Sequence, residues 1–149
     1  MNRRIIKDIT DVSKDITETN TVICDTKISE NIYGPHVIII KGPIDSPYEG
    51  GKYHLCVLFP SDYPMSNVKL TMTTKIYHPN INEHEICLDI LKKNSVGMLS
   101  LKKILEIIYM LMAEPNPADS LNPDIGRELR ENKDKFIETA KSWTDKYAK

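Results

Sequence analysis

Short β-branched runs, separated by turn-forming residues, are the feature that most constrains the fold of this chain. The runs are residues 21–23, 37–40, 53–59 and 68–74. Between them stand Gly42-Pro43 and Glu49-Gly50-Gly51, whose composition is typical of tight turns. Runs of this length bounded by such turns indicate strands joined by short connections. We therefore predict a four-stranded antiparallel meander sheet.

Helical periodicity stands on both sides of these strands. Isoleucine and valine recur at steps of four, three and four residues from Ile5 onwards, which predicts a helix over residues 3–16. A second apolar stripe with helical spacing covers residues 101–112, with Ser100 placed as an N-cap and two prolines following as stop signals. Two further helical stretches are expected at residues 124–131 and 134–146.

The order helix, sheet, loop, helices indicates an α+β fold. With 149 residues, of which 40% are apolar, the chain can fill one core, so a single domain over residues 1–149 is expected. Lys and Arg number 20 and Asp and Glu 21, which gives no charge excess that points to nucleic acid or an anionic membrane. The longest apolar stretch, residues 104–113, is far shorter than the roughly 20 residues that span a bilayer.

The first residues of the chain are basic but lack a following apolar stretch, so they do not resemble a secretory signal. We expect an intracellular protein, cytoplasmic and/or nuclear. The three cysteines are too few and too scattered for a disulfide framework, and free thiols are expected. Cys24 and Cys56 fall in predicted strands, where such a thiol is usually a small buried apolar group. Cys87 lies instead in a long irregular segment, residues 75–99, and such segments are often functional.

The irregular segment carries a family resemblance. Residues 77–91 read YHPNINEHEICLDIL. This stretch closely resembles the active site of ubiquitin-conjugating enzymes, with Cys87 in the place of the thioester-forming cysteine. Further landmarks of the family follow in order along nearly the whole chain: Gly42-Pro43, the residues DSPYEGG at 45–51, Phe59-Pro60, Asp62-Tyr63-Pro64, Pro115-Asn116-Pro117 with Asp119, Trp143-Thr144 and Tyr147-Ala148. The resemblance implies an N-terminal helix, a four-stranded meander, a long active-site loop, a core helix and two C-terminal helices.

The resemblance also implies an activity. Cys87 would accept ubiquitin from an activating enzyme as a thioester, and a lysine amine would then attack that thioester. Thiolates suit this chemistry, since they are good nucleophiles and their thioesters stay reactive toward amines. Asn80 takes the family's asparagine role, either donating to the oxyanion or bracing the loop. Asp119 matches the acidic position that orients the incoming lysine, although a turn or capping role would fit its place as well.

Other residues match supporting positions of the family. Asn116, Asp89 and Leu88 are expected to shape the wall of the site, and His78 to be a buried, hydrogen-bonded structural histidine. Contacts with the activating enzyme or with a RING-type ligase are expected at Arg3, Arg4, Lys7, Met65, Val96, Gly97 and Met98. Contacts with the donor ubiquitin are expected at Glu106, Ile107 and Met110, although the last two could instead lie against the C-terminal helices.

The implied partners are ubiquitin, its activating enzyme and a RING-type ligase. The N-terminal residues also resemble the branch of the family that pairs with a cysteine-less variant partner, while other segments resemble the broad-specificity branch equally well. No metal or organic cofactor is expected, because the upstream activating enzyme consumes the ATP. Four departures from the family are expected to matter, and two of them concern the site and its donor contact. Six residues separate Asn80 from Cys87, one fewer than in most relatives, and Glu106 stands where close relatives often carry leucine.

Four alternative interpretations remain open at this point. His78, His84 and Cys87 could form a zinc site, but the paired ligand spacings of such sites are missing. A cysteine hydrolase could use His84 or His54 as its base, but no landmark of an oxyanion hole accompanies it. The chain could also be a non-catalytic ubiquitin-binding scaffold, or could conjugate a ubiquitin-like modifier.

Overall fold

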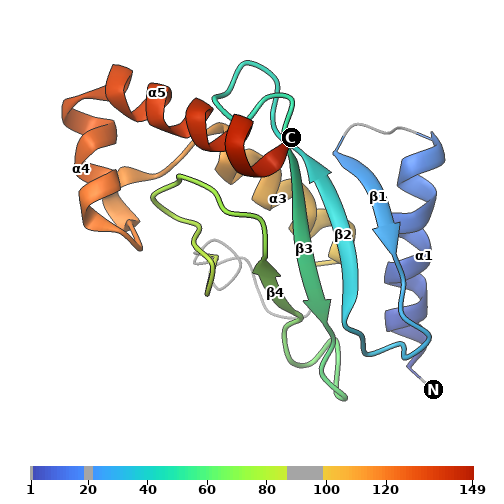
Figure 1. Cartoon of the computed structure of the whole chain (residues 1–149). Coiled ribbons are helices and arrows are strands. Elements are labelled where there is room, and N and C mark those ends of the chain that lie inside the picture. Colours follow the sequence, from blue (N-terminus) through green and yellow to red (C-terminus); the bar gives the residue numbers. More distant parts are fainter. Residues whose placement is uncertain (1, 19–21, 87–98) are drawn as a thin grey trace.

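The computed structural model describes residues 2–18, 22–86 and 99–149. Its centre is a four-stranded antiparallel sheet with the strands in sequence order, which confirms the predicted meander (Figure 1). The strands are β1 (Ile23–Lys27), β2 (His36–Lys41), β3 (Lys52–Leu58) and β4 (Lys69–Met72).

The first strand is displaced from its prediction. The β-branched run suggested residues 21–23, whereas β1 begins at Ile23 and continues through polar residues to Lys27. This strand forms an edge of the sheet, and its pairing with β2 contains an irregularity between Ile23 and Asp25. Polar side chains are tolerated there because one side of an edge strand faces solvent. Pairing with β2 therefore decides where β1 lies, and the local β-propensity does not.

The predicted helices are present. They are α1 (Arg3–Glu18), α3 (Leu101–Ala113), α4 (Pro123–Glu131) and α5 (Lys133–Trp143). The last helix is shorter than the predicted 134–146, since the chain continues as a π-helical turn, η2 (Thr144–Ala148). Ser100 caps α3 as predicted, its hydroxyl accepting the Lys103 N–H at 3.2 Å. Among the described helices, none is both long and apolar enough to cross a membrane.

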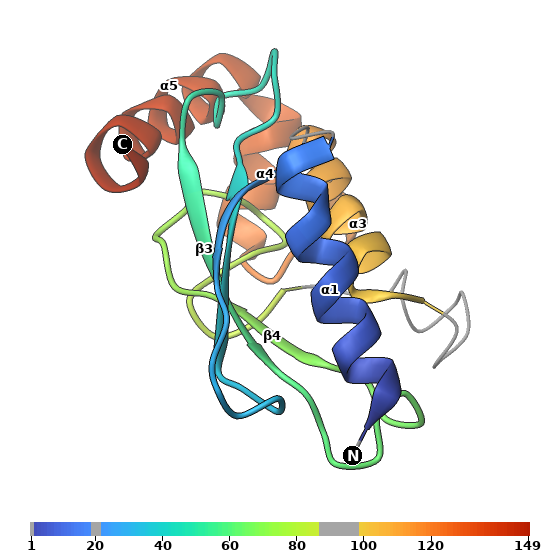
Figure 2. The same cartoon turned by 90° about the vertical axis from the view of Figure 1, so that its right-hand side faces the viewer.

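The core lies between the sheet and two helices. α3 runs behind the sheet in Figure 1, and α1 follows the β1 edge; Figure 2 shows the two helices side by side. Fully buried side chains from these elements form one cluster, including Ile5 and Val12 of α1, Ile38 and Ile40 of β2, Tyr53, Leu55 and Val57 of β3, and Leu105, Ile108 and Met112 of α3. The helices α4 and α5 lie at the opposite end of the sheet from the N-terminus (Figure 1).

Two strand cysteines are more accessible than predicted. Cys24 and Cys56 lie in β1 and β3 with free thiols, but both are half-buried. Cys56 alternates with the fully buried Leu55 and Val57, so its side chain belongs to the opposite, more open face of the sheet. Partial burial raises the pKa of the Cys24 thiol, which favours its neutral form.

Candidate active site

The segment that follows β4 is irregular, as predicted, up to the end of its described part at Ile86. It passes between β4 and α4 in Figure 1. Ile81 forms isolated β-bridges with His78 and with Ile86, and both isoleucines are buried. The Asn82 side-chain oxygen accepts the backbone N–H groups of His84 and Glu85 at 2.8 and 2.9 Å. This asparagine therefore closes a tight turn within the loop.

Several predicted site residues lie outside the described residues. These are Cys87, Leu88, Asp89, Val96, Gly97 and Met98. The second described stretch, residues 22–86, ends at Ile86, the residue directly before Cys87. Ile86 is paired with Ile81, the residue that directly follows Asn80. This end of the stretch therefore lies close to Asn80.

The Asn80 side chain is buried, and both its amide nitrogen and its amide oxygen are hydrogen-bonded. Its Nδ2 group donates to the backbone oxygens of Asn116 and Asp119, at 2.8 and 3.1 Å. Its Oδ1 accepts the Asn116 backbone N–H at 2.8 Å. An amide nitrogen has two hydrogens, and both are used here. The geometry therefore matches the bracing role predicted as one of two alternatives, and a donation to an oxyanion would require one of these bonds to break.

Asn80 braces a turn, η1 (Pro117–Asp119), which carries the second predicted catalytic residue. Asn116 caps this turn by accepting the Ala118 N–H at 3.0 Å, and its Nδ2 lies 3.4 Å from Asp119 Oδ2. The Leu121 N–H donates to the carbonyl of Pro79 at 2.7 Å, which adds a backbone bond between the two segments. The Asp119 side chain is exposed. A solvent-facing carboxylate is thus held on a turn whose backbone is fixed from the interior.

His78 is buried with both ring nitrogens engaged. Nδ1 accepts the Asn80 backbone N–H at 3.0 Å, and Nε2 lies 2.9 Å from the Leu111 carbonyl. This pattern assigns the proton to Nε2. In a continuing helix the Leu111 carbonyl would accept from residue 115, but that residue is Pro115, which has no N–H. The imidazole supplies the missing donor. Burial lowers the His78 pKa to about 4, against the opposing effect of the Leu111 hydrogen bond, so the ring is neutral.

Tyrosines that the sequence analysis did not single out support the same segment. The Tyr48 hydroxyl donates to the Tyr77 carbonyl at 2.6 Å, and the Tyr77 hydroxyl donates to Glu128 of α4 at 2.9 Å. Burial raises the pKa of Tyr77 to about 12, so this hydroxyl stays a donor at neutral pH. Trp143 of α5 packs against the Tyr77 ring, with the ring centroids 5.4 Å apart. The Tyr48 position within the DSPYEGG landmark was the only available signal for its role.

The outer face of α3 carries an open groove of about 600 Å³. It is lined by Val22, Lys103, Glu106, Ile107, Tyr109, Met110, Leu111, Glu114 and Asn116. All three predicted donor-contact residues therefore line one groove, which reaches the Asn116 turn. Met110 is 54% exposed, so the alternative that it packs against the C-terminal helices is wrong. Glu106 forms an ion pair with Lys103 at 3.6 Å on the rim.

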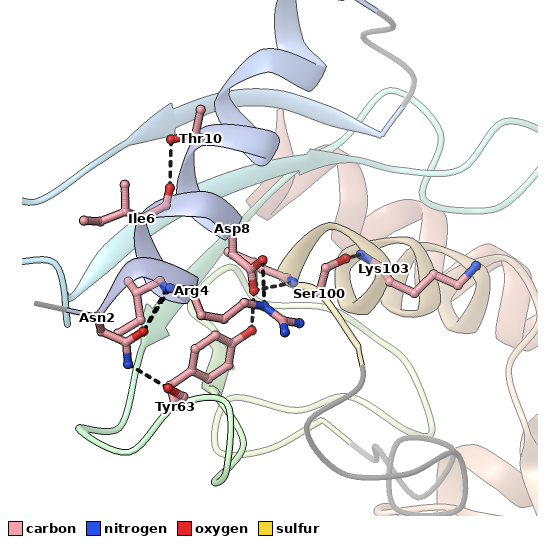
Figure 3. A network of polar contacts seen from close by, with 10 residues as sticks. Asn2, Arg4, Ile6, Asp8, Thr10, Tyr63, Ser100 and Lys103 are labelled. Carbon is pink, nitrogen blue, oxygen red and sulfur yellow. Dashed lines mark hydrogen bonds and ion pairs between the residues drawn. The ribbon is translucent and has the colours of Figure 1, made fainter.

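A second cluster joins α1, the loop at 60–66 and the start of α3 (Figure 3). Its centre is Asp8, a buried carboxylate that accepts from Arg4 Nε at 3.3 Å, from the Tyr63 hydroxyl, and from the Leu101 N–H at 3.3 Å. Burial and the hydrogen bond to Asp8 raise the Tyr63 pKa, so its hydroxyl remains protonated. The carboxylate also lies at the N-terminus of α3, where a negative charge is favoured.

The described residues that were predicted to contact partners lie near this cluster, and they differ in exposure. Arg3 and Lys7 are exposed on α1, and Met65 is 78% exposed on the loop. Arg4 is half-buried and engaged with Asp8. Asn2 ties the two elements together by donating to the Tyr63 carbonyl at 2.7 Å. The exposed members thus come from elements that are linked at one end of the molecule.

The site presents two exposed polar groups, the Asp119 carboxylate and the Asn116 amide. The buried, uncharged side chains of His78 and Asn80 hold the backbone beneath them. Among the residues that the structure describes, no group of three His, Cys, Asp or Glu side chains is placed to hold a metal ion. His78 directs both ring nitrogens to the backbone and has none left for a metal.

Comparison with known proteins places this arrangement in a family. The family model "Ubiquitin-conjugating enzyme" matches residues 4–144. The E2 domain of a ubiquitin conjugating enzyme from Toxoplasma gondii is 34% identical, with 98% of each chain covered and a TM-score of 0.84. A crystal structure from Plasmodium yoelii, of a protein assigned to the same class of enzyme, is also 34% identical. It superposes with a TM-score of 0.85 over 99% of this chain and 97% of the other. The chain belongs to the ubiquitin-conjugating enzyme family.

Proposed function

We propose that this protein accepts ubiquitin from an activating enzyme as a thioester on Cys87 and transfers it to a lysine amine, with a RING-type ligase as its usual partner. The observation that carries the proposal is the set of Asn80 hydrogen bonds, which holds the Asp119 turn beside the segment that leads to Cys87. A scaffold that only binds ubiquitin would have no need to fix a carboxylate at this place.

The reaction consists of two acyl transfers. In the first, the Cys87 thiolate attacks the carbonyl carbon of the thioester on the activating enzyme; a new C–S bond forms, and the enzyme's thiolate leaves. In the second, a neutral lysine amine attacks the new thioester, a tetrahedral oxyanion forms, and Cys87 leaves as the thiolate while the nitrogen loses a proton. Neither step needs a metal or an organic cofactor on this chain, because the activating enzyme consumes the ATP.

Asn80 acts as a positioning residue in this proposal. Its amide hydrogens are both directed to backbone oxygens of the 116–119 segment, so its first effect is on where the turn lies. Asp119 acts at the entrance for the amine. A carboxylate there favours approach of the lysine and accepts or relays its proton, which general-base groups do with gains of about 10²-fold or more. Exposure of the Asp119 side chain allows this contact.

The donor ubiquitin is proposed to lie along the α3 groove. Ile107 and Met110 contribute apolar side chains to the groove, and its lining includes Asn116, which caps the turn that carries Asp119. Arg3, Lys7 and Met65 form the surface proposed for the activating enzyme and the ligase, since basic side chains and an exposed methionine suit a charged and adaptable contact.

A charging assay tests the proposal. The protein is incubated with ubiquitin, ATP and an activating enzyme, and the products are separated with and without reducing agent. We expect a reducible adduct one ubiquitin heavier, lost in Cys87→Ala and retained in the matched controls Cys24→Ala and Cys56→Ala. No adduct on the wild type, beside a working control enzyme, would refute the proposal for ubiquitin. Ubiquitin-like modifiers with their own activating enzymes would then separate a different modifier from a scaffold.

A further inference from the structure

Helix α4 approaches the Asp119 turn more closely than any side chain at the point of contact would permit. The contact is made at Gly126, the only buried residue among those described for α4. A Cβ atom at this position would lie 2.0 Å from Ser120 Oγ, 2.9 Å from Ser120 Cβ and 3.1 Å from the Pro117 carbonyl oxygen. The first two distances are shorter than real side-chain carbons show. Glycine inside a helix costs about 1 kcal/mol relative to alanine, so space at this contact is what favours it.

Rotation of the serine would not relieve the contact. The Ser120 hydroxyl donates to the Pro117 carbonyl at 2.8 Å, and turning it away would break that bond. The Cβ of Ser120 would still lie too close. An added methyl group therefore forces α4 and the Ser120 turn apart, which changes where this turn lies relative to the helix. Asp119 is the residue directly before Ser120, and its carbonyl is held from the other side by Asn80 at 3.1 Å.

We propose that Gly126 is a positioning residue for the transfer to lysine: by letting α4 seat against η1, it sets the place of the Asp119 carboxylate at the amine entrance. This inference rests on the function proposed above. A displaced carboxylate affects the step in which an amine must be oriented and lose a proton. Charging of Cys87 uses a thiolate and requires neither, so it is affected little. Misplacement by about 1 Å can cost about 10²-fold in rate.

The test compares nucleophiles as well as variants. Charged Gly126→Ala is mixed with free lysine and, separately, with hydroxylamine, a small nucleophile that is already neutral at neutral pH. We expect discharge to lysine to slow by roughly 10- to 100-fold. Charging and discharge to hydroxylamine should change by less than about 3-fold, which is small beside the roughly 10²-fold cost of a misplaced group. The lysine defect should shrink as the pH rises toward the lysine pKa of about 10.4, since the amine then needs less help to lose its proton. A loss of packing alone would not separate the nucleophiles in this way.

A compensating substitution tests the contact itself. Ser120→Gly removes both serine atoms that the new methyl group would meet, so Ser120→Gly/Gly126→Ala should discharge to lysine at the rate of Ser120→Gly alone. Glu131→Ala, at the exposed end of α4, is the matched control for adding alanine to this helix. Thermal unfolding of each variant shows that it is folded. If Gly126→Ala alone does not fold, the double variant and Ser120→Gly carry the comparison.

The outcomes separate this inference from the proposed function. Equal slowing of lysine and hydroxylamine discharge by Gly126→Ala would overturn the positioning role and leave the enzyme assignment intact. A folded double variant that stays slower toward lysine than Ser120→Gly would also overturn it. Absence of a thioester on the wild type would instead refute the proposed function, and the role of Gly126 with it.

Discussion

Acidification should destabilise this fold through His78. In the folded protein the ring is buried and neutral, with Nδ1 accepting from Asn80 and the Nε2 proton directed to Leu111. A second proton would occupy Nδ1, remove the acceptor and place a charge where water cannot reach it. The unfolded chain has no such restriction, so it binds a proton near the ordinary histidine pKa of about 6.5.

The size of the effect follows from the two pKa values. Burial lowers the folded-state pKa to about 4, so between this value and about 6.5 the unfolded state binds more protons than the folded state. Stability from this group is therefore fully present above pH ~6.5 and is lost as the pH falls toward about 4. Linkage gives a loss of about 2 kcal/mol at pH 5 and about 3 kcal/mol at pH 4, relative to pH 8. This is a large share of the stability of an ordinary domain.

Urea denaturation of the wild type and of His78→Gln between pH 4.5 and 8 measures this loss. Glutamine is neutral over the whole range, so other titrating groups cancel in the difference between the two proteins. We expect wild type to be the more stable at pH 8 and the two free energies of unfolding to approach each other in acid by about 2 kcal/mol near pH 5. His84→Gln, an exposed position in the same loop, is the control and should keep the wild-type slope. Parallel pH curves for wild type and His78→Gln would refute the buried neutral histidine.

Four further substitutions have definite expected outcomes. Asp119→Ala should slow discharge to lysine by about 10²-fold and charging far less; equal slowing in single-turnover assays would exclude its role at the amine entrance. Asn80→Ala should slow lysine discharge more than hydroxylamine discharge if it braces the turn, whereas equal slowing of both would indicate an oxyanion donor. Tyr63→Phe removes a donor from the buried Asp8 carboxylate and should lower the free energy of unfolding by about 1.5–3 kcal/mol in urea denaturation, and an unchanged value would mean that this bond contributes nothing. Met110→Glu should leave charging intact and slow ligase-independent discharge at least several-fold; an unchanged rate would show that the α3 groove does not hold the donor.

Local sequence patterns predicted most helices and strands, because helical periodicity and N-capping act over a few residues. Ser100 caps α3 where the sequence placed it. The start of β1 could not be predicted in the same way, since pairing with β2 decides it and involves residues up to 17 positions away, from Ile23 to Ile40. The half-burial of Cys24 and Cys56 also depends on which face of the sheet is covered by helices. The sequence of a single strand does not determine this.

Residues of the site were found through motifs, but their contacts were not. Asn80 was recognisable, while its partners stand 36 and 39 positions away. Two other residues gave local signals that could have been used. Asp8 follows Ile5 by three positions, so it falls on the buried face of α1 and needs partners there. Gly126 stands inside a helix, where glycine is unfavourable without a packing reason.

His78 and Asn80, two positions apart, hold the end of α3 and the Asp119 turn at fixed places relative to each other. His78 binds the Leu111 carbonyl, which the end of α3 leaves without a donor because Pro115 follows. Asn80 binds the backbone of the turn that comes next in the chain. The segment from His78 to Asn80 therefore fixes two neighbouring parts of the site. These are the last turn of α3, the helix whose outer face carries the groove, and the turn that carries Asp119. His78 Nδ1 also accepts the Asn80 N–H, so these two residues cannot move independently. Loss of either side chain should therefore disturb both the end of α3 and the turn that carries Asp119.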